Sequence, residues 1–165
     1  ATTEIYTLSL HDALPISRGE NMYKKILVPI DGSDLSYQAV AGAARFAKGL
    51  GAEVYVLTVI EPYSYTNLSE YRPESIEQYD QRVKEQAREM LEKARECFDK
   101  VGVEAKICSK KSFSPSEAIM EVCDEIGCDL IFMASHGRKG IAAVLLGSET
   151  QKVLTHSKVP VMVFR

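Results

Sequence analysis

The sequence has neither a long apolar run nor a large excess of charge of one sign. No stretch approaches the roughly 20 consecutive apolar residues that a helix needs to cross a bilayer. The 20 Lys and Arg residues nearly balance the 23 Asp and Glu residues, and the net charge is -3. Such a chain has no overall attraction to nucleic acid or to an anionic membrane. We therefore expect a cytoplasmic protein with neither partner.

Spacings typical of metal sites and of common catalytic motifs are also missing. The cysteines form no CxxC pair, the histidines form no HxxxH or HExxH pair, and no GxxxxGK[ST] phosphate loop is present. A zinc site, or a serine or cysteine triad built on these histidines, is therefore not expected. We expect reduced thiols that pack as small hydrophobes, with a redox switch as the alternative. The cysteines are Cys97, Cys108, Cys123 and Cys128.

The first 21 residues differ from the rest. They contain no basic segment ahead of an apolar one, which argues against a secretory signal. Strand and helix patterns begin just after Met22. We therefore expect residues 1–21 to be a disordered or non-native leader and residues 22–165 to form one domain. The alternative is a native strand around Ile5–Leu10, and a large fall in melting temperature on deletion of residues 1–21 would favour it.

From Tyr23 onward, strand and helix patterns alternate along the chain. Helical spacing predicts four helices, of which the third starts at Ser114 and Pro115 and the fourth spans Ser148–His156 with Ser148 as its cap. This alternation predicts a doubly wound α/β domain with a five-stranded parallel sheet and helices on both faces. The expected strands are Lys25–Ile30, Glu53–Ile60, Val103–Cys108, Leu130–Ala134 and Val159–Phe164.

The segment from Asp129 to Thr150 has the most informative pattern. An apolar strand leads into Ser135–Gly140, which holds two glycines, and Gly147–Thr150 then starts a helix. Free backbone N–H groups in a glycine loop and at a helix N-terminus bind anions. The segment therefore predicts a phosphate site.

In such sheets, ligands bind beyond the carboxyl ends of the strands, where the strand order reverses. The segments expected there are Pro29–Ser33, Val59–Glu61 and Met133–Gly140. Asp31 follows a buried strand directly, and its carboxylate can accept hydrogen bonds from a ribose or a base. Beside Gly32 it could instead serve only to form a turn. The convergence of two loops on one crevice favours the binding role.

The chain resembles the universal stress protein family from Met22 to Arg165. The resemblance implies the strand order 3-2-1-4-5, in a Rossmann-like fold similar to the adenine nucleotide alpha hydrolases. In the ATP-binding branch it also implies a G-x2-G-x9-G-[ST] loop, in which Ala134 here replaces the first glycine. The matching pieces are Ile26–Ser33, Leu57–Ile60, Ser114–Ile119, Met133–Gly137, Leu145–Ser148 and Val159–Val163.

The resemblance also implies an adenine nucleotide, namely ATP or else AMP or ADP, with Mg²⁺ accompanying a triphosphate. Asp31 and the backbone of Ile30 and Val59 would hold adenine and ribose. The phosphates would lie on backbone N–H groups of the glycine loop and the last helix, including Gly147. Arg138 would add positive charge or remain a solvated cation, and His136 would pack or hydrogen-bond within the loop. The expected binding residues are Pro29, Ile30, Asp31, Val59, Met133, Ala134, His136, Gly137, Arg138, Gly147, Ser148, Glu149 and Thr150.

Three functions stay open at this point. The first is a regulatory ATP-binding protein of the stress response whose partner contacts depend on nucleotide. The second is an enzyme, a slow ATPase or an adenylating enzyme, although Asp31–Asp34 differs from the SGGxDS loop of adenylating relatives. The third is a nucleotide-free dimeric interaction protein. The apolar strand Val159–Phe164 predicts a homodimer, because an edge strand can pair with its own copy, as in the family.

Overall fold

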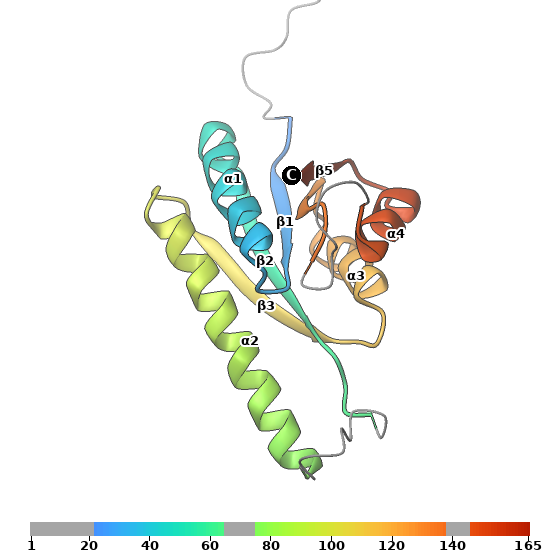
Figure 1. The fold of residues 1–165 in the computed structure, drawn as a ribbon. Helices are drawn as coiled ribbons and strands as arrows, with labels where there is room; N and C mark the ends of the chain where they lie inside the picture. The colour runs from blue at the N-terminus through green and yellow to red at the C-terminus, as the bar shows by residue number, and fades with distance from the viewer. Residues whose placement is uncertain (1–21, 65–74, 138–145) are drawn as a thin grey trace, which may run out of the picture.

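The computed structural model describes residues 22–64, 75–137 and 146–165. A five-stranded parallel sheet in the order β3-β2-β1-β4-β5 separates two layers of helices (Figure 1). The predicted doubly wound fold and strand order are confirmed, and the expected leader, residues 1–21, lies outside the described residues. The strands are β1 Lys25–Ile30, β2 Glu53–Ile60, β3 Ala105–Lys111, β4 Leu130–Ala134 and β5 Val161–Phe164. The helices are α1 Asp34–Leu50, α2 Ile76–Asp99, α3 Pro115–Ile126 and α4 Ser148–His156.

Each face of the sheet has its own apolar core. Because successive strand residues point to opposite faces, Ile26 and Val28 of β1 pack beneath α1 and α2, whereas Leu27 packs beneath α3 and α4. All three side chains are fully buried. Burial on both faces explains why the sequence of β1 is a nearly continuous apolar run.

Three strand boundaries, namely both ends of β3 and the start of β5, and one helix cap differ from the sequence-based expectation. β3 begins at Ala105 and not Val103, because the N–H of Val103 donates to the carbonyl of Phe98 in the turn after α2. β5 begins at Val161 and not Val159, because the Ser157 hydroxyl holds the Val159 N–H in a turn. The N-cap of α4 is Gly147, and Ser148 is the first helical residue.

The state of the cysteines differs in part from the expectation that all four are reduced. Cys123 and Cys128 form a disulfide across the turn between α3 and β4, where Gly127 ends the helix in a left-handed conformation. Both cysteines are buried. Cys97 and Cys108 are free, and burial raises the pKa of the Cys108 thiol. The expectation of reduced thiols is therefore wrong for one pair and confirmed for the other.

Reduction of this disulfide should lower the melting temperature. Closing so short a loop is expected to stabilise the fold by about 2 kcal/mol in the chain-entropy account, which corresponds to about 5 °C for a chain of this size. Differential scanning calorimetry with and without dithiothreitol measures the effect. Cys123→Ala should abolish the response to reductant, and Cys97→Ala, which removes a free thiol, should preserve it. A reductant-insensitive wild type with four titratable thiols would contradict the bond.

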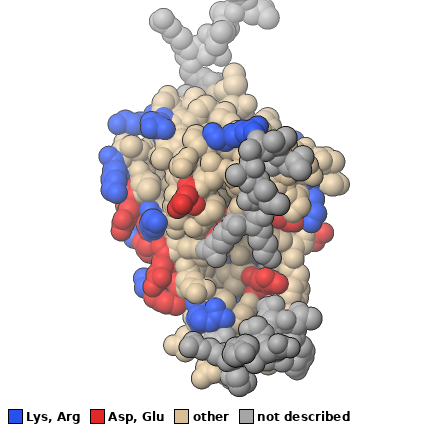
Figure 2. Space-filling view, in the orientation of Figure 1, with Lys and Arg blue, Asp and Glu red and all other residues tan. Residues whose placement is uncertain are grey.

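Charged side chains of both signs are interspersed on the face shown in Figure 2. The outer face of α2 carries such residues, including Glu85 and Arg88, which form an exposed pair with a 2.6 Å separation. The charged residues on this face of the helix therefore form a solvated surface. None of the helices in the described part of the chain is both long and apolar enough to traverse a bilayer.

Candidate functional site at the carboxyl edge of the sheet

The strand order reverses between β1 and β4, the two central strands. Their ladder pairs Ile26 with Leu130 and Leu27 with Ile131, and both strands then run on toward the carboxyl edge. Beyond that edge the chain leaves β1 toward α1 on one face and leaves β4 toward α4 on the other. A crevice is expected where two such connections diverge. Asp31 and Ser135 follow the two strands at this point.

The buried polar side chains gather at the same edge. In the described part of the chain, every buried polar side chain lies near the end of a strand or in the first turn of a helix. Their hydroxyl groups make this edge polar, whereas the two cores are apolar. The residues are Ser36, Thr58, Ser116, Ser135 and Thr150.

Asp31 is held in place by the start of α1. Its Oδ1 accepts hydrogen bonds from the Ser33 N–H at 3.1 Å and from the Ser33 hydroxyl at 2.7 Å. The Ser33 hydroxyl in turn accepts the Ser36 N–H at 3.2 Å and caps α1. Asp31 therefore does form a turn, through bonds to its Oδ1. Sequence reasoning missed the role of Ser33, although a serine two residues after an aspartate is a signal for such a turn.

The second oxygen of Asp31 lies against Gly137. A Cβ atom built on Gly137 would overlap the Asp31 carboxylate and would stand 3.2 Å from its Cγ. No side chain at residue 137 fits this spacing unless the carboxylate moves. The structure thus brings together Asp31 and Gly137, two residues that the sequence assigned to one site from loops far apart in the chain.

The first turn of α4 lies at the same edge of the sheet. Its backbone N–H groups differ in whether they donate to an acceptor within the protein. The Gly147 N–H donates to the Ser135 carbonyl at 2.8 Å, so this amide is already engaged within the protein. The first helical hydrogen bond of α4 runs from the Gln151 N–H to the Gly147 carbonyl. The N–H groups of Ser148, Glu149 and Thr150 precede it and have no acceptor within the helix.

The N-cap residues of α1 and α2 cap their helices with a side chain, whereas those of α3 and α4 do not. The Ser33 side chain caps α1, and Ser75 forms a capping box with Gln78 at the start of α2. The N-cap of α4 is a glycine and provides no side chain for this purpose. An uncapped helix N-terminus carries partial positive charge and several N–H donors, which suit an anion.

Glu149 does not point its carboxylate at these amides. Its Oε2 accepts the Ser116 N–H of α3 at 2.8 Å, and its Oε1 lies 2.8 Å from Lys152 Nζ. The Thr150 hydroxyl donates to the Ala134 carbonyl at 3.1 Å. The side chains of Glu149 and Thr150 are thus engaged within the protein, and only their backbone N–H groups can serve the expected phosphate site.

The remaining expected residues line the ends of the strands. Met133 is buried in the core beneath α3 and α4, and His136 is half-buried with its Nδ1 3.1 Å from the Ser135 hydroxyl. Ala134 is the last residue of β4, where the extended backbone tolerates a Cβ atom, so its replacement of the first motif glycine is accommodated. Arg138 lies outside the described residues. Pro29, Ile30 and Val59 lie at the ends of β1 and β2, as expected.

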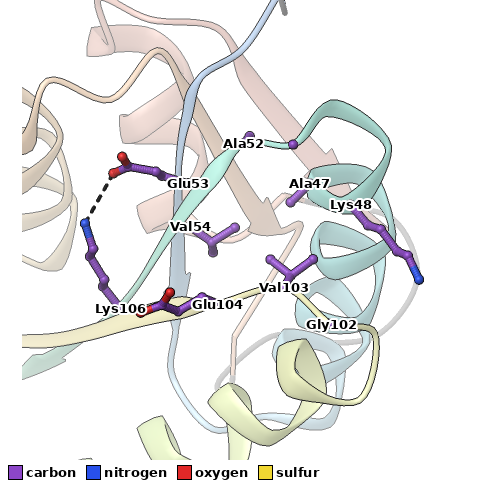
Figure 3. Close-up of a pocket in the computed structure, with 10 residues that line it drawn as sticks. Ala47, Lys48, Ala52, Glu53, Val54, Gly102, Val103, Glu104 and Lys106 are labelled. Carbon is purple, nitrogen blue, oxygen red and sulfur yellow. Dashed lines mark hydrogen bonds and ion pairs between the residues drawn. The ribbon is translucent and has the colours of Figure 1, made fainter.

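A separate hollow of about 370 Å³ lies at the opposite, amino edge (Figure 3). The end of α1, the start of β2 and the turn before β3 enclose it. Its charged side chains do not converge on one point, and Glu53 pairs with Lys106 at 3.3 Å. The carboxyl edge is therefore the better candidate for a binding site.

The sequence of the chain is similar to those of known proteins. The profile of the Universal stress protein family matches residues 22–165. The chain is 33% identical to Universal stress protein MJ0531 of Methanocaldococcus jannaschii over 150 residues, which cover 91% of this chain and 86% of the relative. It is 34% identical to Universal stress protein YxiE of Bacillus subtilis over 150 residues, with 87% and 100% covered.

Solved structures have the same fold. Hypothetical protein MJ0577 of Methanocaldococcus jannaschii superposes with a TM-score of 0.73 and 30% identity, covering 87% of this chain and 96% of that one. A universal stress protein in complex with cAMP gives a TM-score of 0.66 at 24% identity, with 87% and 97% covered. One from Archaeoglobus fulgidus in complex with dAMP gives 0.65 at 21% identity, with 87% and 98% covered. The chain belongs to the universal stress protein family.

Proposed function

We propose that the chain binds an adenine nucleotide at the carboxyl edge of its sheet and acts as a regulatory protein in the cytoplasm. The observation that carries the proposal is the juxtaposition of the uncapped N-terminus of α4 with the Asp31–Gly137 contact. The α4 amides suit a phosphate, and the Asp31 carboxylate suits a ribose hydroxyl or a base N–H. Two proteins of the same fold are described in complexes with cAMP and dAMP, which is consistent with an adenylate here.

In this proposal the backbone of Ile30 and Val59 and the carboxylate of Asp31 surround adenine and ribose. The N–H groups of Ser148, Glu149 and Thr150 receive the phosphates, while Gly147 fixes the start of the helix. The nucleotide is ATP, AMP or ADP, and Mg²⁺ would come with a triphosphate. Arg138 would add positive charge beside the phosphates.

Mass spectrometry of the ligand released from purified protein tests the proposal. We expect an adenine nucleotide in the denatured supernatant, and isothermal titration calorimetry with AMP, ADP and Mg-ATP should then rank the three. Turnover of Mg-ATP above about 1 per second, the low end for enzymes, would favour an ATPase. Protein that carries no nucleotide and binds none of the three would favour the interaction protein.

We also propose that the chain forms a homodimer through its last strand, Val159–Phe164. β5 is the terminal strand of the sheet, and its side chains are only half-buried. The carbonyls of Pro160 and Phe164 accept hydrogen bonds from β4. Since backbone polar groups alternate sides along a strand, the N–H groups of Val161 and Val163 point outward and can pair with a second copy.

Val163→Pro should therefore convert the dimer to a monomer. Proline removes an outward N–H without breaking the β4–β5 ladder, and it is tolerated in edge strands. Multi-angle light scattering at micromolar concentration measures the mass. Val163→Thr keeps the N–H group and should remain dimeric. A monomeric wild type, or a dimeric proline variant, would contradict the proposed pairing.

A further inference from the structure

The carboxylate of Glu149 lies between the N-termini of two helices. Glu149 is the second residue of α4, and its Oε2 accepts the N–H of Ser116, the second residue of α3, at 2.8 Å. Its Oε1 lies 2.8 Å from Lys152 Nζ, one turn along α4. The side chain is 33% exposed, so it stands at the margin of the molecule and not in open solvent.

This carboxylate supplies the side-chain cap that the N-cap residue of α3 does not provide. Ser114 is the N-cap of α3 but makes no side-chain cap hydrogen bond, and Pro115 at the first position has no N–H. The Ser116 N–H is therefore the first donor of α3, and it is in a buried residue. Burial on its own raises the pKa of Glu149, but the hydrogen bonds from Lys152 and Ser116 outweigh burial and bring this pKa below its ordinary value. The group is thus an anion at neutral pH.

Three hydrogen bonds hold the first turn of α4 from different sides. The Gly147 N–H donates to the Ser135 carbonyl, the Thr150 hydroxyl donates to the Ala134 carbonyl, and Glu149 accepts the Ser116 N–H. The first two attach the turn to the end of β4. Glu149 provides the attachment to α3, across a separation of 33 residues in the sequence.

We propose that the side chain of Glu149 positions the phosphate site and is not itself a phosphate ligand, whereas its backbone N–H remains among the donors to the phosphate. By occupying the N-terminus of α3, its carboxylate leaves α4 as the open anion site and fixes the direction in which the amides of Ser148–Thr150 point. The inference rests on the proposed adenine-nucleotide function. It adds a role for the Glu149 side chain to the backbone role that the family resemblance implied.

Two substitutions separate the hydrogen bond from the charge. Glu149→Ala removes both, and should weaken AMP binding by about tenfold, the lower end of what loss of an orienting group costs at metal sites. Glu149→Gln keeps an oxygen that can accept the Ser116 N–H, and should bind AMP within about twofold of wild type, because in this proposal the hydrogen bond to Ser116, and not the charge, orients the first turn of α4. Lys152→Ala leaves the bond to Ser116 intact and is the matched control.

Calorimetric titration with AMP gives the affinities, and the backbone ¹H–¹⁵N signal of Ser116 reports the hydrogen bond itself. We expect the Ser116 amide proton to move upfield in Glu149→Ala and to stay near its wild-type position in Glu149→Gln and Lys152→Ala. Thermal melts identify any variant that does not fold. If Glu149→Ala does not fold, Glu149→Gln and Lys152→Ala still distinguish a role of the hydrogen bond from a role of the charge.

Unchanged AMP affinity in a folded Glu149→Ala protein would overturn this inference but not the proposed function. So would Glu149→Gln binding as weakly as Glu149→Ala while its Ser116 signal stays in place, because the charge and not the bond would then matter. A wild type that binds no adenine nucleotide would overturn the proposed function, and this inference with it.

Discussion

Gly137→Ala should weaken adenine-nucleotide binding about tenfold to a hundredfold. The added methyl group would overlap the Asp31 carboxylate, which Ser33 holds by two hydrogen bonds. The carboxylate would have to turn away and would lose the hydrogen bond to the nucleotide that we propose for it. A hydrogen bond to a charged group is worth about 1.5–3 kcal/mol, and each 1.4 kcal/mol corresponds to about tenfold in affinity.

Gly49→Ala is the matched control for this substitution. Gly49 lies in α1, and a Cβ atom there would meet nothing within 4 Å. Alanine is also the better helix former by about 0.8–1 kcal/mol, so this variant should keep its affinity and melt at a slightly higher temperature. Isothermal titration calorimetry and a thermal melt measure both properties. Wild-type affinity in Gly137→Ala would show that Asp31 does not contact the ligand.

Gly147→Val should reduce both stability and nucleotide occupancy. A Cβ atom on Gly147 would stand 3.2 Å from the Cα of His136, which is backbone and cannot rotate away. The two further methyl groups of valine would force α4 away from the end of β4 and break the bond from the Gly147 N–H to Ser135. Overpacking of this kind costs about 1–3 kcal/mol, and the displaced amides would no longer meet the phosphate.

Gly147→Ala is the matched control, because it replaces the glycine but adds only one methyl group beside His136. Its single methyl group requires His136 to yield by only a few tenths of an ångström, so both effects should be intermediate. Thermal melts give the stability, and mass spectrometry of released ligand gives the occupancy. If valine left occupancy at the wild-type level, the start of α4 would not be part of the site. The side chain at this position faces His136, so the effect arises from the protein's own backbone and not from direct contact with phosphate.

Local patterns were sufficient to predict the central part of the fold. β1, β2 and β4 are apolar runs that end at a clear break, such as Asp31 after Ile30, and their observed bounds match the predicted ones. β3 is an edge strand whose last residues are polar, Lys110 and Lys111 among them, so its apolar run ends before the strand does. Because an edge strand can continue through polar residues, its hydrophobic pattern alone does not mark its end.

The candidate site was predictable in location but not in detail. The rule that ligands bind where strand order reverses, together with the family resemblance, brought Asp31 and Gly137 to one edge. The partners of individual groups depend on packing between distant segments. The bond from Glu149 to Ser116 joins two helices, and the Cys123–Cys128 disulfide depends on the reversal of the chain at Gly127. Neither contact leaves a pattern in the sequence.

The most direct test follows the backbone amides of α4 by ¹H–¹⁵N NMR during titration with AMP. We predict large shifts at Ser148, Glu149 and Thr150, and a small shift at Gly147, whose N–H already donates to Ser135. Asp31→Asn should weaken the titration without changing which amides respond. Saturable binding with no shift in the first turn of α4, or with shifts confined to the amino-edge hollow around Gly51 and Gly102, would contradict the account.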